Sequence, residues 1–161
     1  MKKLLSISGL ITIVGFVLFF SGPCFGENIA LKKECEIKAE KASLLIKKMG
    51  STAAFETIED PKGPFIGKNS HLFCIDSDSG KLLAHKFGYI GFDMNQYRSA
   101  DNGHPYTGIL KTAETKDKGW VTYMTYGSGP ERREKPELKH MHFFKVPDEK
   151  ILLCVGYWND H

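Results

Sequence analysis

The stretch GPFIGKNSHLFCIDSDSGKLLAH, residues 63–85, decides the fold. It holds two short apolar runs, residues 71–75 and 81–85, on either side of the turn DSDSG at residues 76–80. Aspartate and serine side chains bond to their own backbone in turns, and glycine supplies the positive φ that a tight turn needs. Two apolar runs around such a turn predict a β-hairpin.

The two faces of the first predicted strand differ in their side chains. Because strand residues alternate between faces, His71, Phe73 and Ile75 should share one side of the sheet. Leu72 and Cys74 should share the other side. One face must receive a helix, and the other can then line a cavity or take a second cover.

Residues 28–49 predict one long amphipathic helix that packs against this hairpin. Gly50 suits the position that follows a helix, and Ser51 should cap a second short helix that ends near Ile58, before Pro61. The apolar residues of the long helix recur at spacings of three and four and form one stripe: Leu31, Cys35, Ala39, Ala42, Leu45, Ile46 and Met49.

The second half of the chain adds strands to the hairpin. Residues 86–104 show no steady period, and a connection of this length inside a small domain is usually functional. A short helix should begin at Pro105 and end near Thr115. Three strands then follow at residues 120–126, 139–145 and 151–158. Antiparallel strands with helices to one side predict an α+β domain.

The first 26 residues have the order of a secretory signal: a basic start, an apolar run over residues 4–20 and a small-residue exit. We place the cleavage after Gly26, with Gly26 and Cys24 as the small residues before the cut. The alternatives are lipoprotein cleavage at Cys24, which Pro23 disfavours, and an uncleaved membrane anchor, for which the run is short. Cleavage leaves residues 27–161 as one domain in an oxidising compartment, either periplasmic or secreted.

Charge and cysteine content narrow the possible partners. The formal net charge of +3 falls to +1 when two lysines leave with the signal segment. Nucleic-acid binding needs a concentrated basic face, so we expect no nucleic-acid partner. The remaining cysteines, Cys35, Cys74 and Cys154, either form one disulfide among three possible pairings or stay as buried free thiols.

The order of several residues resembles the single Cache domain, the extracytoplasmic sensor module of bacterial receptors. The resemblance covers about residues 30–160 and rests on order and spacing together. The residues that carry it are Gly63-Pro64-Phe65, a strand ending at Asp76 before a turn at Gly80, Leu83-Ala84-His85, Gly119-Trp120-Val121 followed by Tyr123, Lys139 at the start of a strand, and Gly156 in the last strand.

The resemblance implies a PAS-like sheet of five antiparallel strands, with a long N-terminal helix on one face and a ligand pocket on the other. It implies binding of small organic molecules, such as carboxylates, amino acids or related metabolites, without catalysis. We expect no cofactor and no metal. Residue by residue, His85 matches the histidine that ends the family's second strand, and Tyr123 matches its tyrosine. Lys139 matches the basic residue that opens the fourth strand, and His71 stands at an aromatic position of the first.

Side chains on neighbouring strands supply a candidate binding site. Those that alternate in phase and can face one cavity are Tyr123, Thr125, Lys139 and Met141. An ammonium group with a hydroxyl and an imidazole suits a carboxylate in a partly apolar cleft. We expect Lys139 to anchor the anion, Tyr123 and His85 to orient it, and two aromatic rings to form apolar walls. The complete candidate set is His71, Phe73, His85, Tyr106, Tyr123, Thr125, Lys139 and Met141.

Metal binding has weaker support in the sequence. His140 and His142 share a strand face as metal ligands would, but two ligands do not close a site. The pattern Asp76-x-Asp78-x-Gly80 is similar to the start of a calcium loop. It lacks the later acidic ligands, so it predicts a turn.

Catalysis has no local motif to support it. Cys74 or Cys154 beside His85 is conceivable as a nucleophile and base, but no C-x-x-C-H, Walker, G-x-S-x-G or H-E-x-x-H motif is present. We therefore expect a sensor or binding domain that acts alone or passes its state to a membrane receptor. The alternatives are a structural or interaction module whose own side chains fill the pocket, and a metal-binding protein that uses His140 and His142.

Overall fold

The computed structural model describes residues 28–67, 70–127 and 129–158, so the signal segment predicted for residues 1–26 lies outside the described residues. Each helix and strand predicted for the described part is present, with ends that differ by no more than two residues. The elements are α1 Ile29–Met49, α2 Ser51–Glu59, β1 Ser70–Asp76, β2 Leu82–Ala84, η1 Met94–Gln96, α3 Pro105–Ala113, β3 Lys118–Thr125, η2 Gly129–Glu131, β4 Glu137–Lys145 and β5 Ile151–Trp158.

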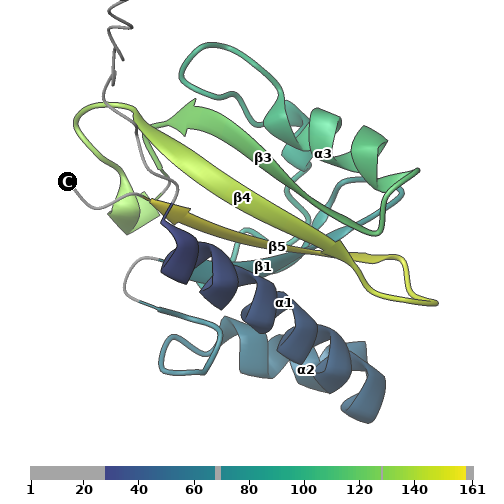
Figure 1. Ribbon diagram of the computed structural model, residues 1–161. Coiled ribbons are helices and arrows are strands. Elements are labelled where there is room, and N and C mark those ends of the chain that lie inside the picture. The colour runs from purple at the N-terminus through teal and green to yellow at the C-terminus, as the bar shows by residue number, and fades with distance from the viewer. Residues whose placement is uncertain (1–27, 68–69, 128, 159–161) are drawn as a thin grey trace, which may run out of the picture.

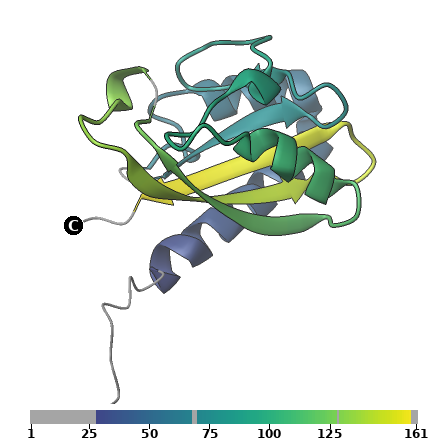
Figure 2. The same cartoon turned by 90° about the horizontal axis from the view of Figure 1, so that it is seen from above.

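The five strands form one antiparallel sheet in the order β2-β1-β5-β4-β3, which confirms the predicted α+β class and five-stranded sheet. β5 comes last in the sequence but lies at the centre, where it pairs with β1 on one side and β4 on the other. α1 and α2 lie on one face and α3 on the other (Figure 1). The prediction that the helices lie to one side was therefore wrong, because Tyr106, Ile109 and Ala113 of α3 bury their side chains against the second face. Figure 2 shows the same arrangement from above, with α3 in front of the sheet and α1 behind it.

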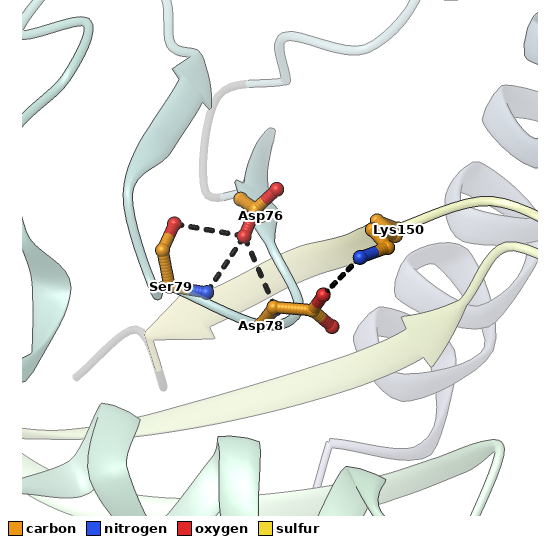
Figure 3. A network of polar contacts seen from close by, with 4 residues as sticks. All are labelled: Asp76, Asp78, Ser79 and Lys150. Atoms are coloured by element: carbon orange, nitrogen blue, oxygen red, sulfur yellow. Dashed lines mark hydrogen bonds and ion pairs between the residues drawn. The ribbon is translucent and has the colours of Figure 1, made fainter.

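The turn between β1 and β2 forms as its residues predict (Figure 3). Asp76 Oδ1 accepts hydrogen bonds from the backbone N–H of Asp78 at 3.1 Å and of Ser79 at 2.6 Å, and from Ser79 Oγ at 2.7 Å. Gly80 closes the turn with a φ of 73° and donates its N–H to the Asp76 carbonyl at 2.9 Å. Lys150 Nζ contacts Asp78 Oδ2 at 2.5 Å and ties the turn to the chain entering β5. Asp76 is therefore a turn residue.

The two faces of β1 divide the protein into two apolar clusters. Leu72 and Cys74 are buried with the α1 residues, whereas Phe73 and Ile75 are buried on the α3 side. The alternation predicted for this strand is confirmed. The long helix therefore covers one face only, which leaves the opposite face to α3 and the loops.

α1 packs through small residues, which let the helix approach the sheet closely. Its fully buried positions include Cys35, Ala39 and Ala42. Asn28 caps the helix, because its Oδ1 accepts the N–H of Leu31 at 3.1 Å. Within the described residues, no helix has both the length and the apolar character needed to cross a bilayer.

The junction between α1 and α2 differs from the prediction in one detail. Gly50 has a φ of 82° and donates its N–H to the Ile46 carbonyl at 2.9 Å, as expected after a helix. Ser51 is not the cap of α2, because the backbone of Gly50 already turns into the next helix and Ser51 is its first helical residue. The expected capping hydrogen bond from a serine side chain is absent at this junction.

The cysteines of the described residues are free and buried, in agreement with the second of the two alternatives. Phe73 pairs with Cys154, and Cys74 pairs with Leu153, in the β1–β5 ladder. Cys74 and Cys154 therefore point to opposite faces of the sheet. Cys35 shares the α1 face with Cys74, in the same apolar cluster. These thiols act as small core residues.

We expect the substitution Gly108→Ala to stabilise the protein. Gly108 lies inside α3, and no heavy atom lies within 4 Å of the position that its Cβ would occupy. Glycine in a helix interior costs about 0.5–1 kcal/mol relative to alanine, since it loses more backbone entropy on folding. Urea unfolding should show an increase of about that size in the free energy of unfolding. A decrease would mean that α3 needs the flexibility of this position.

Candidate functional site

A cavity of about 210 Å³ lies on the sheet face opposite α1. Its walls come from β1, β2, β3 and β4, from α3, and from the loop that contains η1. No described residue of α1 or α2 contributes to its lining. The residues that line it are His71, Phe73, Leu82, His85, Tyr89, Phe92, Met94, Tyr97, Tyr106, Tyr123, Thr125, Gly127 and Lys139.

The structure brings seven of the eight candidate residues together around this cavity. The exception is Met141, which is fully buried on the same face but does not line the cavity. Met141 lies beside Gly156, and its Cε would be 2.8 Å from a Cβ at that position. The sheet face on which Met141 lies was predicted correctly, but its side chain is part of the apolar core.

Lys139 reaches the cavity by crossing β5 at Gly156, which has no side chain. Gly156 is the β5 residue that pairs with both Met141 of β4 and His71 of β1. A Cβ on Gly156 would lie 2.6 Å from Lys139 Cε, so the lysine stem occupies the space that a side chain would fill. Lys139 Nζ lies 4.9 Å from the centroid of the Trp158 ring, a cation–π contact that helps to orient it.

Two imidazoles line the same cavity. The His71 and His85 ring centroids are 5.3 Å apart, with the rings nearly perpendicular. His85 Nδ1 accepts the backbone N–H of Phe87 at 3.1 Å, so the neutral ring carries its hydrogen on Nε2. Burial lowers the pKa of His71 well below its usual value, and the charges of Lys139 and Lys86 lower it further. His71 is therefore neutral at physiological pH.

Four hydroxyl groups form two pairs in the cavity wall. The hydroxyl oxygens of Tyr106 and Tyr123 are 2.9 Å apart. The Tyr97 hydroxyl bonds to Thr125 Oγ1, which also accepts the N–H of Gly127 at 3.0 Å. Burial raises the pKa of Tyr106 and of Tyr123, so both phenols stay protonated. Because one hydroxyl of each pair donates to the other, each pair keeps one hydrogen that it can offer to a ligand.

The described lining residues include a lysine and two histidines but no aspartate or glutamate. Their polar groups are an ammonium group, hydroxyls and imidazole nitrogens, set among aromatic rings. An ammonium group in such a partly apolar cavity favours an anion with several acceptor oxygens.

The predicted metal candidates lie on the other face of the sheet. The His140 ring stacks on Tyr157 with centroids 4.9 Å apart, and the His142 ring packs on Trp120 at the same distance. His142 Nδ1 is also 2.9 Å from the Gly119 carbonyl oxygen. Within residues 28–67, 70–127 and 129–158, no group of three or more metal-binding side chains is placed to hold an ion.

Comparison with solved structures identifies the fold. A structure described as the periplasmic sensor domain of a chemotaxis protein matches with a TM-score of 0.58 and 15% sequence identity, over 81% of this chain and 92% of the other. A second, from a study of carboxylic acid recognition by a Cache chemosensory domain, matches with a TM-score of 0.56 and 15% identity, over 81% and 89%. This chain has a Cache-like fold. No protein-family model and no curated protein matches the sequence significantly.

The Cache-like fold confirms the resemblance found in the sequence, and it places the cavity on the expected face. Six further lining residues escaped prediction: Leu82, Tyr89, Phe92, Met94, Tyr97 and Gly127. Four of these lie in residues 86–104, the stretch without a steady period. Its length was a signal that it folds over something, but no pattern showed which of its side chains turn inward.

The buried imidazole predicts a pH dependence of stability. Because the pKa of His71 is lower in the folded protein than the value of about 6.5 in the unfolded chain, the unfolded chain binds more protons below that pH. The contribution of His71 to the free energy of unfolding is therefore fully present above about pH 6.5. Below that pH it falls by up to about 1.4 kcal/mol per pH unit. The pKa of His142 is also lowered by burial, which acts in the same direction.

Melting temperatures of the Cache-like domain between pH 7.5 and 5 measure this effect. The variant His71→Asn should lose part of the pH dependence and keep the part that His142 contributes in this window. An identical pH profile for the variant and the wild type would show that the folded protein protonates His71 as readily as the unfolded chain does.

Proposed function

We propose that this protein is an extracytoplasmic sensing domain that binds a small organic anion, most simply a carboxylate, and has no catalytic activity of its own. The observation that carries the proposal is the cavity itself: it contains Lys139 and donor groups, and no described lining residue is acidic. A cavity of about 210 Å³ lies below the range of roughly 300–1,000 Å³ typical of drug-sized ligands, which suits a small metabolite.

The donor set supports a carboxylate over an amino acid. Lys139 supplies charge, and His85 and the tyrosine pair supply directional donors. An amino acid would bring an ammonium group into the cavity, where none of the described lining residues offers a carboxylate to receive it. Burial of an ammonium group without such a partner is costly.

The fold and the N-terminal sequence support the location and the role. The structures that this chain resembles are described as a periplasmic sensor domain and a chemosensory domain that recognises a carboxylic acid. The signal segment predicted at residues 1–26 would deliver the domain to the same kind of compartment. We propose that it acts there alone or passes its state to a membrane receptor.

The chemistry of the buried nucleophiles supports a non-catalytic role. Ser70 Oγ lies 2.6 Å from Lys38 Nζ, but the serine hydroxyl donates its hydrogen to Glu34 Oε1 at 2.7 Å. This hydroxyl therefore bridges an ion pair and is not activated by a neutral base. Burial raises the pKa of the Cys35 thiol to about 12 and also raises that of Cys154, so both stay in the unreactive thiol form.

A thermal-shift screen tests the proposal. Small carboxylates should raise the melting temperature, because a ligand that binds only the folded state stabilises it. Amines of matched size should not, since the cavity holds Lys139. The alternative in which side chains fill the pocket predicts that no compound of either class changes a cooperative melting transition.

A further inference from the structure

The cavity has a charged end and an apolar end, and the apolar end continues onto the protein surface. From this arrangement we infer that the ligand is an amphiphilic anion, a medium-chain carboxylate, whose apolar tail runs from Lys139 past Leu82 to a rim formed by Phe92. The inference rests on the proposed function, because it needs an anion to be held at Lys139. It adds that the part of the ligand beyond the carboxylate is an apolar chain.

The two ends of the cavity lie on well-separated strands. Lys139 is on β4 and Leu82 is on β2, three positions away in the strand order. Strands are about 4.8 Å apart, so the two ends are separated by roughly 14 Å across the sheet. The lysine stem bridges part of this span because it lies over Gly156. The remainder is more than a two- or three-carbon acid would fill.

Aromatic and aliphatic surfaces form much of the wall between these ends. Phe73 and Tyr106 form its middle, with ring centroids 6.0 Å apart. Leu82 and Met94 form the far end, and both are buried. Such a wall stabilises methylene groups through the apolar surface that it removes from water.

The apolar end opens onto one exposed aromatic side chain. Phe92 is 44% exposed, yet it lines the cavity next to Leu82. Tyr89 is 54% exposed and also lines the cavity, but its ring lies at the other end, 6.0 Å from the ring of His85. Ile90, between them in sequence, is 56% exposed but does not line the cavity. Apolar groups clustered on a surface often mark a binding site. A ligand tail that leaves the cavity at this end would cover the ring of Phe92.

The rim is held in place by its backbone. Leu82 donates its N–H to the Phe92 carbonyl at 2.8 Å, and the Leu82 carbonyl accepts the N–H of Gly91 at 2.8 Å.

A chain-length series tests the inference. Isothermal titration calorimetry with sodium butanoate, hexanoate and octanoate should show the dissociation constant falling about two- to fourfold per added methylene. 1-Octanol and octylammonium should bind more weakly than octanoate, because only the carboxylate pairs with Lys139. Equal binding of octanol and octanoate would overturn the amphiphilic anion.

A rim variant locates the tail. Phe92→Ser should reduce the gain in affinity from butanoate to octanoate, because it removes the exposed apolar ring at that end of the cavity. Ile90→Ser is the matched control, since it removes an equally exposed apolar side chain outside the cavity, and it should keep the full gain. An equal loss of the gain in both variants would overturn the rim.

The series separates this inference from the proposed function. Butanoate binding that requires Lys139, without any gain for longer acids, would overturn the amphiphilic ligand and leave the small-anion site intact. No binding by any acid of the series or of the earlier screen would overturn both.

Discussion

Replacement of Lys139 by methionine should weaken carboxylate binding by about 10- to 150-fold, because a hydrogen bond to a charged group contributes about 1.5–3 kcal/mol. Methionine keeps an unbranched apolar stem that packs against Trp158, so the fold should be retained. The measurement is calorimetric titration of wild type and variant with the carboxylate that most raises the wild-type melting temperature.

Lys116→Met is the matched control for this substitution. Lys116 is exposed and lies outside the cavity, and the variant changes the net charge by the same amount. The control should bind as wild type does. If both variants lose affinity equally, anion binding depends on the overall charge of the protein. If neither loses affinity, Lys139 is not the anchor.

Replacement of Gly156 by alanine should weaken carboxylate binding by at least about tenfold, the equivalent of losing one charge-assisted contact. The new Cβ would lie 2.6 Å from Lys139 Cε and 2.8 Å from Met141 Cε, so both side chains must move. Movement of Lys139 takes its ammonium group away from the cavity. Overpacking should also lower the free energy of unfolding by about 1–3 kcal/mol, which chemical denaturation measures.

Gly108→Ala makes the same chemical change on α3 without a steric conflict. It should therefore raise stability and leave carboxylate binding unchanged. Unaltered carboxylate binding by the Gly156→Ala variant would show that Lys139 does not need the space beside Gly156. Stability loss in Gly156→Ala without loss of affinity would mean that only Met141 moves.

Local patterns in the sequence were enough to predict the elements and their faces. The turn at residues 76–80 forms through the Asp76 side chain, which acts within four residues of itself. Four residues of the predicted stripe are buried in α1: Cys35, Ala39, Ala42 and Ile46. Met49, at the end of the helix, is exposed, and Lys38, outside the stripe, is buried. The faces of β1 follow the period of two. These features depend on neighbours in sequence, so periodicity and turn chemistry carry them.

The candidate site was predicted in part for the same reason. Phase along β3 and β4 correctly placed Tyr123, Thr125 and Lys139 on one face. It also placed Met141 there, but phase cannot distinguish a cavity wall from the core beside it. That difference depends on Gly156, which belongs to another strand and leaves the space that Lys139 fills.

The sequence by itself determined the layers of this protein, because hydrophobic period, turn residues and helix ends are local properties of the chain. Only the tertiary structure decided the cavity and its rim, because empty space arises where side chains from distant segments fail to meet. Phe92 reaches the mouth through hydrogen bonds between its loop and Leu82. A glycine in β5 becomes part of the site once Lys139 of the neighbouring strand lies across it.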